Sequence, residues 1–575
     1  MAANIFVITI FFGIFFIYSV HGIEGAENKP PNILLIIADN LGHDDIGSFG
    51  NADAKTPNLD QLSNEGMKFT RMYSQPSSTS SRAAILTGIL PARMMLSQGW
   101  SGFSDFISPA QNSGIHPSEH TIASLLHTKQ YHNAFIGKWH LGYGPHGGFL
   151  PLENSYQSFY GIPLTHTDAC SANPQSYTND GYLFVLWLAN WGISWTVLIV
   201  FLTTFRFFGL VSGKKMVIFI AVMVTVLGVV RLWFMITIAN PMSCILMRND
   251  QIIEQPYKEE NMTLRFTQEA IEVVRKHSTL KDHPLFLTVS YIAPTIPCFT
   301  SKFFKGKTKS CYSDSVSELD WNIGQILDSM KKYKLDENLL VVFTSANGHI
   351  THHGYPYKPV SKKIMGFKQK TSKFRGGMGT ELEGGLRVPT IIKWTGKIPE
   401  NTQIEIQTTT MDIFPTIVKI VNPNRLKAIK RSRKIDGKSL LPLFEDPSIS
   451  EHHNHIFHYC DSQVVGTITY EHLKISMFTG IDGLTCTGEH NNPPLIYNIT
   501  ADPREEHPLP PETYDELAFI ITRDIFNHQA SIDKDRFSFL DTIPWPWYFP
   551  CANFPYCSKT IDGDEEFSDL NLEQL

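Results

Sequence analysis

Apolar runs alternate with amphipathic segments along most of this 575-residue chain, and no other feature restricts its fold as strongly. Four runs have the length and composition of buried strands, at residues 32–39, 133–140, 285–295 and 339–348. Helical patterns such as TPNLDQLSNEG and FTQEAIEVVRK lie between them. This alternation predicts an α/β domain in which helices cover both faces of a mostly parallel sheet. Ligands of such sheets bind beyond the carboxyl ends of the strands.

The chain changes character after about residue 425. Short strand candidates, TITYEHLKISMF and PLIYNIT, are followed there by the helix-like segment YDELAFIITRDIFNHQASI. We therefore expect an α/β domain over residues 28–424 and a smaller α+β domain over residues 425–575.

Residues 182–239 interrupt the first domain with two apolar runs, each about the 20 residues needed to cross a bilayer. The link RFFGLVSGKK is short and basic, which by the positive-inside tendency places it in the cytosol. We expect a transmembrane helical hairpin, a membrane as partner, and both globular parts in the lumen. A buried hairpin in a soluble core is the alternative, and Arg231 is unfavourable in a lipid-facing span.

The first 22 residues join a short polar start to an apolar run, which predicts a secretory signal peptide, with an uncleaved anchor as the alternative. Sequons at Asn261 and Asn498 are compatible with glycosylation in the exported compartment. The eight cysteines include no CxxC pair, so disulfides fit better than a zinc or thiol redox centre. The formal charge of -6 gives no reason to expect nucleic acid as a partner.

The stretch SQPSSTSSRAAILTG, residues 74–88, is a candidate site. A serine-rich turn precedes a helix that we expect to begin near Arg82, so hydroxyls and a guanidinium lie together at the positive end of a helix. Such an end can hold an oxyanion.

Five motifs resemble the sulfatase family in order and spacing: PNILLIIADN, STSSRAAILTG, GKWHLG, FTSANGH and GGLRVPTII. The apolar hairpin and the segment FSFLDTIPWPWYFPC resemble the steryl-sulfatase and arylsulfatase group within it. The resemblance implies an alkaline-phosphatase-like α/β sandwich, sulfuric ester hydrolysis, a Ca²⁺ ion and a membrane such as that of the endoplasmic reticulum. It also implies disulfides that join Cys170 with Cys244 and Cys551 with Cys557.

The implied nucleophile is a formylglycine made from cysteine within the pattern Cys-x-Pro-x-Arg. The matching position is Ser78, and the proline is also absent, so no formylglycine is expected. The serine hydroxyl could accept one sulfuryl group, but it has no second oxygen with which to release the ester. Arg82, Lys138 and His140 match the family residues that orient the nucleophile and bind the sulfate. A structural role is the default for a lone Lys or His, but here the motif GKWHLG favours the functional role, because Lys138 and His140 follow a strand and match on both sides.

Only some of the calcium ligands that the resemblance implies are present. The matching positions are Asp39, Asn40, Ser78, Ala346 and Asn347. Two carboxylates are lost, so Ca²⁺ should bind weakly, because its affinity depends on ligand charge and number. An equally good interpretation is that Asp39 only caps the turn after its strand. Two further family positions are altered, since Met378 replaces a lysine and the segment containing Thr295 replaces a histidine.

Three hypotheses follow. The first is a membrane-anchored lumenal pseudo-sulfatase that retains weak binding of sulfated sterols or aryl sulfates, or acts through partners. The second is an active hydrolase, either a sulfatase after unusual maturation or a slow phosphatase that uses Ser78. The third is a structural or interaction protein with an empty cleft. Nothing in the sequence indicates an oligomeric state.

Overall fold

A computed structural model describes most of the globular part of the chain. The described residues are 29–94, 112–164, 244–280, 283–295, 298–350, 372–459, 465–479, 489–510 and 514–532, with a few isolated positions besides. Residues 1–22, where the signal peptide is predicted, lie outside them. The division of the chain at residues 424 and 425 stays a prediction.

An 11-stranded mixed sheet forms the centre of the described structure, in the order β10-β2-β9-β8-β1-β7-β3-β4-β5-β6 with β11 beside β2. Its strands are β1 (Asn32–Ala38), β2 (Met67–Tyr73), β3 (His132–Lys138), β4 (Ser158–Ile162), β5 (Leu246–Arg248), β6 (Gln251–Glu254), β7 (Leu285–Ser290), β8 (Leu339–Ser345), β9 (Arg387–Trp394), β10 (Thr402–Ile404) and β11 (Thr408–Thr409). The five central strands, β8-β1-β7-β3-β4, are parallel, whereas β9, β5 and β6 pair antiparallel to their neighbours. All four predicted strands are confirmed.

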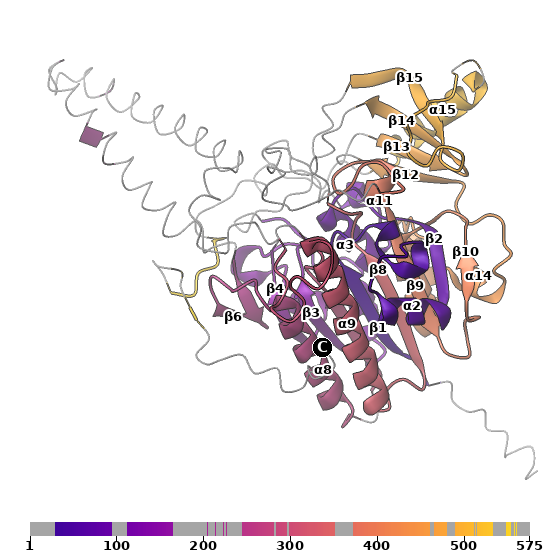
Figure 1. The fold of residues 1–575 in the computed structure, drawn as a ribbon. Helices are drawn as coiled ribbons and strands as arrows, with labels where there is room; N and C mark the ends of the chain where they lie inside the picture. The colour runs from indigo at the N-terminus through magenta and orange to yellow at the C-terminus, as the bar shows by residue number, and fades with distance from the viewer. Residues whose placement is uncertain are drawn as a thin grey trace, which may run out of the picture.

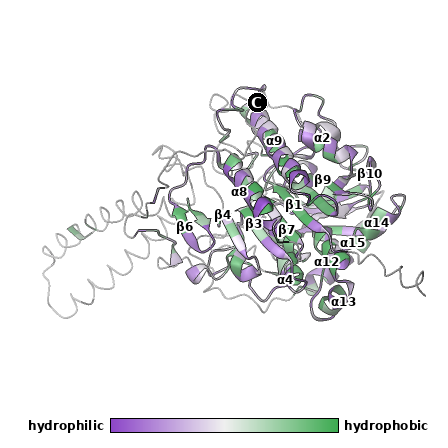
Figure 2. Cartoon of the chain, turned by 90° about the horizontal axis from the view of Figure 1, so that it is seen from below, coloured by the Kyte–Doolittle hydropathy of each residue, from purple (hydrophilic) through white to green (hydrophobic). Residues whose placement is uncertain are grey.

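Helices cover both faces of this sheet, as predicted (Figure 1). One face carries α2 (Pro57–Asn64), α8 (Met262–His277) and α9 (Cys311–Lys332); the other carries α3 (Ser78–Thr87), α4 (Ile122–His127), α12 (Ile413–Val421), α13 (Pro423–Ser432) and α14 (Leu441–Glu445). Strand β1 shows why two cores form. Its successive side chains alternate between the faces, so Leu35 packs in one core and Leu34 in the other. Figure 2 shows the apolar strands enclosed between these helical layers.

A second sheet of four antiparallel strands lies at the carboxyl end of the described chain. It contains β12 (His455–Tyr459), β13 (Val465–Tyr470), β14 (Leu473–Thr479) and β15 (Glu489–Asn498), with α15 (Asp515–Ala530) packed against it. Its apolar face also contacts Leu90 and Met411 of the first unit, in one shared core cluster. A hydrogen bond of 2.8 Å between His453 and Asp412 places the start of β12 next to the segment that precedes α12.

The predicted transmembrane hairpin is corrected here, and with it the membrane as a partner. Within the part of the chain that the structure describes, no helix combines the length and apolarity that a bilayer crossing requires. Residues 182–239 lie outside the described residues except for isolated helical positions such as Val222 and Val226, which are about half exposed.

Disulfides are present, as the cysteine content predicts. Cys551 bonds to Cys557, which confirms the predicted pair, and Cys298 bonds to Cys311, which the sequence did not indicate. Cys244 is disulfide-bonded too. Its predicted partner, Cys170, lies outside the described residues.

Candidate functional site

The carboxyl ends of adjacent parallel strands meet at one edge of the large sheet. Asp39 follows β1, Ser290 ends β7 and Lys138 ends β3. The close approach of β3 and β7 requires a glycine at position 137, because φ is +104° there and a Cβ atom would collide with the carbonyl oxygen of Ser290. Polar side chains from three neighbouring strands are thus gathered in one place.

Helix α3 brings two further side chains to the same edge. It begins at Ser78, four residues earlier than the predicted start near Arg82, because Ser77 caps the helix by accepting a hydrogen bond from the Ser80 amide at 3.2 Å. One helical turn separates Ser78 from Arg82, so both side chains lie on one face of the helix. The Arg82 Nε atom donates to Ser78 Oγ at 3.1 Å.

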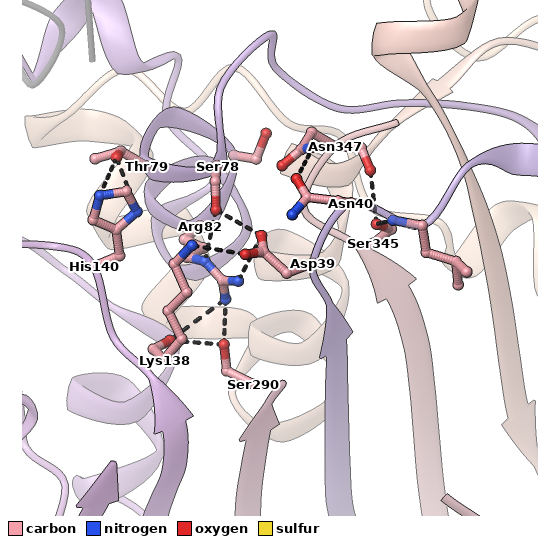
Figure 3. Close-up of polar contacts among 12 residues, drawn as sticks. Asp39, Asn40, Ser78, Thr79, Arg82, Lys138, His140, Ser290, Ser345 and Asn347 are labelled. Atoms are coloured by element: carbon pink, nitrogen blue, oxygen red, sulfur yellow. Dashed lines mark hydrogen bonds and ion pairs between the residues drawn. The ribbon is translucent and has the colours of Figure 1, made fainter. Parts of the chain in front are cut away.

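Asp39 is the centre of a buried polar cluster (Figure 3). Ser78 Oγ donates to Asp39 Oδ1 at 2.8 Å, Arg82 Nη2 lies 3.0 Å from the same oxygen, and Lys138 Nζ lies 2.7 Å from Oδ2. Ser290 Oγ accepts a hydrogen bond from Arg82 and donates to the Lys138 carbonyl oxygen at 2.7 Å. We call Asp39, Ser78, Arg82 and Lys138 the Asp39 cluster. The structure brings together these four residues that the sequence singled out.

Two cations share one carboxylate in the Asp39 cluster. Burial lowers the pKa of the Arg82 guanidinium, and the charge of Asp39 opposes that shift. Burial likewise lowers the pKa of Lys138; Asp39 opposes it and Arg82 adds to it. With both cations protonated the cluster carries a net positive charge in a buried place. Such a place favours an anionic ligand.

His140 and Asn347 lie beside the cluster rather than in it (Figure 3). Both ring nitrogens of His140 lie 3.2 Å from Thr79 Oγ1. On the opposite side of Asp39, Asn347 Nδ2 donates to Asn40 Oδ1 at 2.7 Å. This hydrogen bond links the carboxyl end of β1 to the carboxyl end of β8.

The residues of this edge do not fit a calcium ion. Ca²⁺ takes six to eight oxygen ligands, preferably including several carboxylates. Here Asp39 is the one carboxylate among the matching positions, and two cations and a hydroxyl already contact it. Ala346 offers no side-chain oxygen, and the Asn40 oxygen accepts from Asn347. The Asn347 Oδ1 atom is buried without a hydrogen-bond partner, but one amide oxygen does not offset the repulsion of two adjacent cations.

The remaining predicted positions lie near the cluster or apart from it. Met378 is in a loop tied to the turn before α3, since the next residue, Gly379, donates its amide to the Pro76 carbonyl at 3.0 Å. Thr295 is buried two residues beyond Ala293, whose carbonyl oxygen accepts from the Asp39 amide at 3.0 Å. The sequon residues Asn261 and Asn498 are both half-buried, and their glycosylation stays a prediction.

Sequence reasoning missed several polar residues. Ser290 and Thr79 contact site residues; no local motif marks Ser290, whereas Thr79 lies inside the STSSRAAILTG motif without having been singled out. Asp412, His452 and His453 also come together in the fold, with one ligand atom from each within 4.8 Å of the others. The two adjacent histidines were the only feature of the sequence that could have indicated this second group.

Comparisons with known proteins agree with the fold and the motifs. A family model for Sulfatase matches residues 31–423, and one for the C-terminal region of aryl-sulfatase matches residues 451–559. Human steryl-sulfatase is 31% identical over 96% of this chain and 97% of its own length. Human arylsulfatase D is 32% identical over 93% of each chain. The crystal structure of the PsFucS1 sulfatase from Pseudoalteromonas sp. superimposes with a TM-score of 0.68 at 22% identity, over 89% of this chain and 93% of that one.

Proposed function

Because this chain belongs to the sulfatase family and is similar to steryl-sulfatase and arylsulfatases, we propose that it binds sulfate esters without completing a catalytic cycle. The observation that carries the proposal is the Asp39 cluster. Its excess positive charge suits a sulfate group, while position 78 holds a serine in place of the cysteine that matures to formylglycine.

In this proposal Arg82 and Lys138 bind the sulfate oxygens. The exposed fraction is 0% for Asp39, 1% for Arg82, 2% for Lys138 and 8% for Ser78, so the ligand approaches on the Ser78 side. Ser290 orients Arg82, and Thr79 orients His140 toward the same side. A bound sulfate would add charge-assisted hydrogen bonds to the ion pairs that the two buried cations make with Asp39.

The ligand class follows from the relatives. Steryl and aryl sulfates are the esters that the names of the relatives indicate, so we propose a sulfated sterol or an aryl sulfate as the ligand. The disulfides Cys298–Cys311 and Cys551–Cys557 support a place in an oxidising compartment of the secretory pathway.

A second candidate function is slow hydrolysis of phosphate esters. One contact favours it: Ser78 Oγ donates to Asp39 at 2.8 Å, which is the geometry of a nucleophile paired with a base. Attack by Ser78 would break the ester bond, release the alcohol and leave a phosphoserine that water must then hydrolyse.

The experiment compares binding with turnover on the full-length chain. Calorimetry with inorganic sulfate and with 4-methylumbelliferyl sulfate should show binding to the wild type. The variant Lys138→Met should weaken it at least tenfold, because one of the two cations is lost. Lys393→Met is the matched control: its ammonium pairs with Glu65 near the start of β8, at the end of the sheet opposite to the Asp39 cluster, so binding should be unchanged.

Turnover decides between the candidates. We expect no sustained release of methylumbelliferone, and Ser78→Cys alone should not restore it, because Asn40, Ala346 and Met378 remain. Mass spectrometry of the peptide from Met72 to Arg82 should show an unmodified serine. Many rounds of sulfate release from such a protein would refute the proposal, and many rounds with a phosphate ester alone would establish the second candidate.

A further inference from the structure

A second polar cluster lies where the two sheets meet, away from the Asp39 cluster. Asp412 ends the short 3-10 helix η8 (Thr410–Asp412), just before α12, and His452 and His453 precede β12. The exposed fraction of the side chains is 0% for Asp412 and 7% for each histidine. Two imidazoles and a carboxylate are thus buried together, with donors from both structural units.

The distances suit a small tetrahedral cation. His452 Nε2 lies 3.4 Å from Asp412 Oδ2, and His453 Nε2 lies 2.8 Å from Oδ1. Zinc holds nitrogen and oxygen ligands at about 2.0–2.1 Å, which puts neighbouring ligand atoms about 3.3 Å apart in a tetrahedron. The two histidine–carboxylate distances lie on either side of that value, and the three ligand atoms all lie within 4.8 Å of one another.

One ring nitrogen of the cluster is only weakly satisfied. His452 Nε2 is buried, and its contact with Asp412 Oδ2 at 3.4 Å is too poorly aligned to be a good hydrogen bond. A buried polar atom without a good hydrogen bond is costly, and a metal ion would satisfy its lone pair.

The backbone around the three side chains is fixed by hydrogen bonds. The amides of Thr409 and Lys438 donate to the Asp412 carboxylate at 3.0 and 2.7 Å. Lys438 Nζ also donates to the His452 carbonyl oxygen at 2.7 Å, and Gln407 donates to the carbonyl oxygen of His453. Such outer contacts orient metal ligands in established sites.

A cavity of about 400 Å³ adjoins the cluster, and His453 lines it together with Lys438 and His455. Zinc in proteins is usually four-coordinate, and three protein ligands leave one position for water. The cavity is large enough to supply that water.

We propose that Asp412, His452 and His453 bind a Zn²⁺ ion where the two sheets meet. The carboxylate supplies the one negative charge, and the imidazoles supply neutral nitrogen ligands of the type that zinc prefers. The ion would tie the start of β12 to the segment before α12. Its binding would stabilise the folded chain, because the unfolded chain does not hold the three ligands together. This proposal does not depend on the function of the Asp39 cluster.

The test uses the full-length chain without an affinity tag, stripped with EDTA and titrated with ZnCl₂ against a chromogenic chelator. We expect one zinc per wild-type chain and a zinc-dependent rise in melting temperature. Replacing zinc by Co²⁺ should give the visible absorption bands of a tetrahedral site.

His452→Gln is the decisive variant, because the one described polar contact of its Nε2 atom is the long one of 3.4 Å to Asp412. It should fold, bind zinc at least tenfold more weakly and lose the thermal shift. His455→Gln is the matched control: it lines the same cavity but pairs with Asp524, so it should bind zinc as the wild type does. The proposal fails if wild-type protein binds no equivalent of zinc, or if H452Q binds as tightly as wild type.

Discussion

Two buried ion clusters in this protein have opposite composition. In the Asp39 cluster two cations contact one carboxylate. Near the second sheet, Lys474 of β14 is one ammonium between two carboxylates, 3.3 Å from Glu383 and 3.1 Å from Glu505. We call these three residues the Lys474 cluster. Both clusters are almost completely excluded from water.

The two clusters differ in whether their charges are balanced by other groups of the protein. Glu383 also receives a hydrogen bond from Tyr73 at 3.1 Å and lies 3.4 Å from Arg387, so the charges around Lys474 balance within the protein. The Asp39 cluster keeps an excess cation beside a hydroxyl. A balanced buried cluster serves the fold, whereas an unbalanced one suits a charged ligand.

The largest effect is expected from Lys474→Met. It leaves two buried carboxylates without the ammonium between them, and breaking a buried ion pair in this way costs about 3–5 kcal/mol of unfolding free energy. Urea denaturation followed by circular dichroism measures it. Lys393→Met, at a partly exposed pair, should cost no more than about 1 kcal/mol. Equal losses in the two variants would contradict the structural role.

A smaller loss of stability is expected from Lys138→Met. Asp39 keeps Arg82 as its partner and the repulsion between the two cations disappears, so the variant should lose only about 1.5–3 kcal/mol, the contribution of one hydrogen bond to a charged group. The same denaturation series checks this value. A loss as large as that of Lys474→Met would mean that the Asp39 cluster is a structural cluster like the other.

The smallest effect is a change in pH dependence. Burial and the charge of Glu383 raise the pKa of Glu505, despite the opposing effect of Lys474. A group whose pKa is higher in the folded state adds stability below its unfolded pKa, about 4.3 for Glu, and that stability is lost as the pH rises. Glu505→Gln should therefore remove a decline of stability above about pH 4.3. Melting temperatures from pH 4 to 8 measure it, and an unchanged profile would contradict the assignment.

Local patterns in the sequence predicted most of the fold. The four strand-like runs are strands β1, β3, β7 and β8, because continuous apolar segments bury themselves wherever helices can cover them. The positions of Asp39 and Lys138 at the carboxyl edge of the sheet were also predicted, because each lies at the end of a strand-like run. The hairpin prediction was wrong for the described chain, because apolarity alone does not establish a membrane-spanning helix.

Contacts between distant segments could not be predicted in the same way. Asp412 and the two histidines are about 40 residues apart, and no local motif relates them. The same holds for Ser290, which contacts Arg82 from a strand that follows it by 208 residues. Such pairs depend on how β7 and β12 are placed, which is a property of the whole sheet arrangement.

The sequence by itself determined that this chain is a sulfatase-type α/β protein and that position 78 has a serine, since both follow from the identity and local order of residues. Only the tertiary structure decided that Arg82 and Lys138 both contact Asp39. The physical reason is that a charge interaction depends on distance and on burial, and the fold alone sets both.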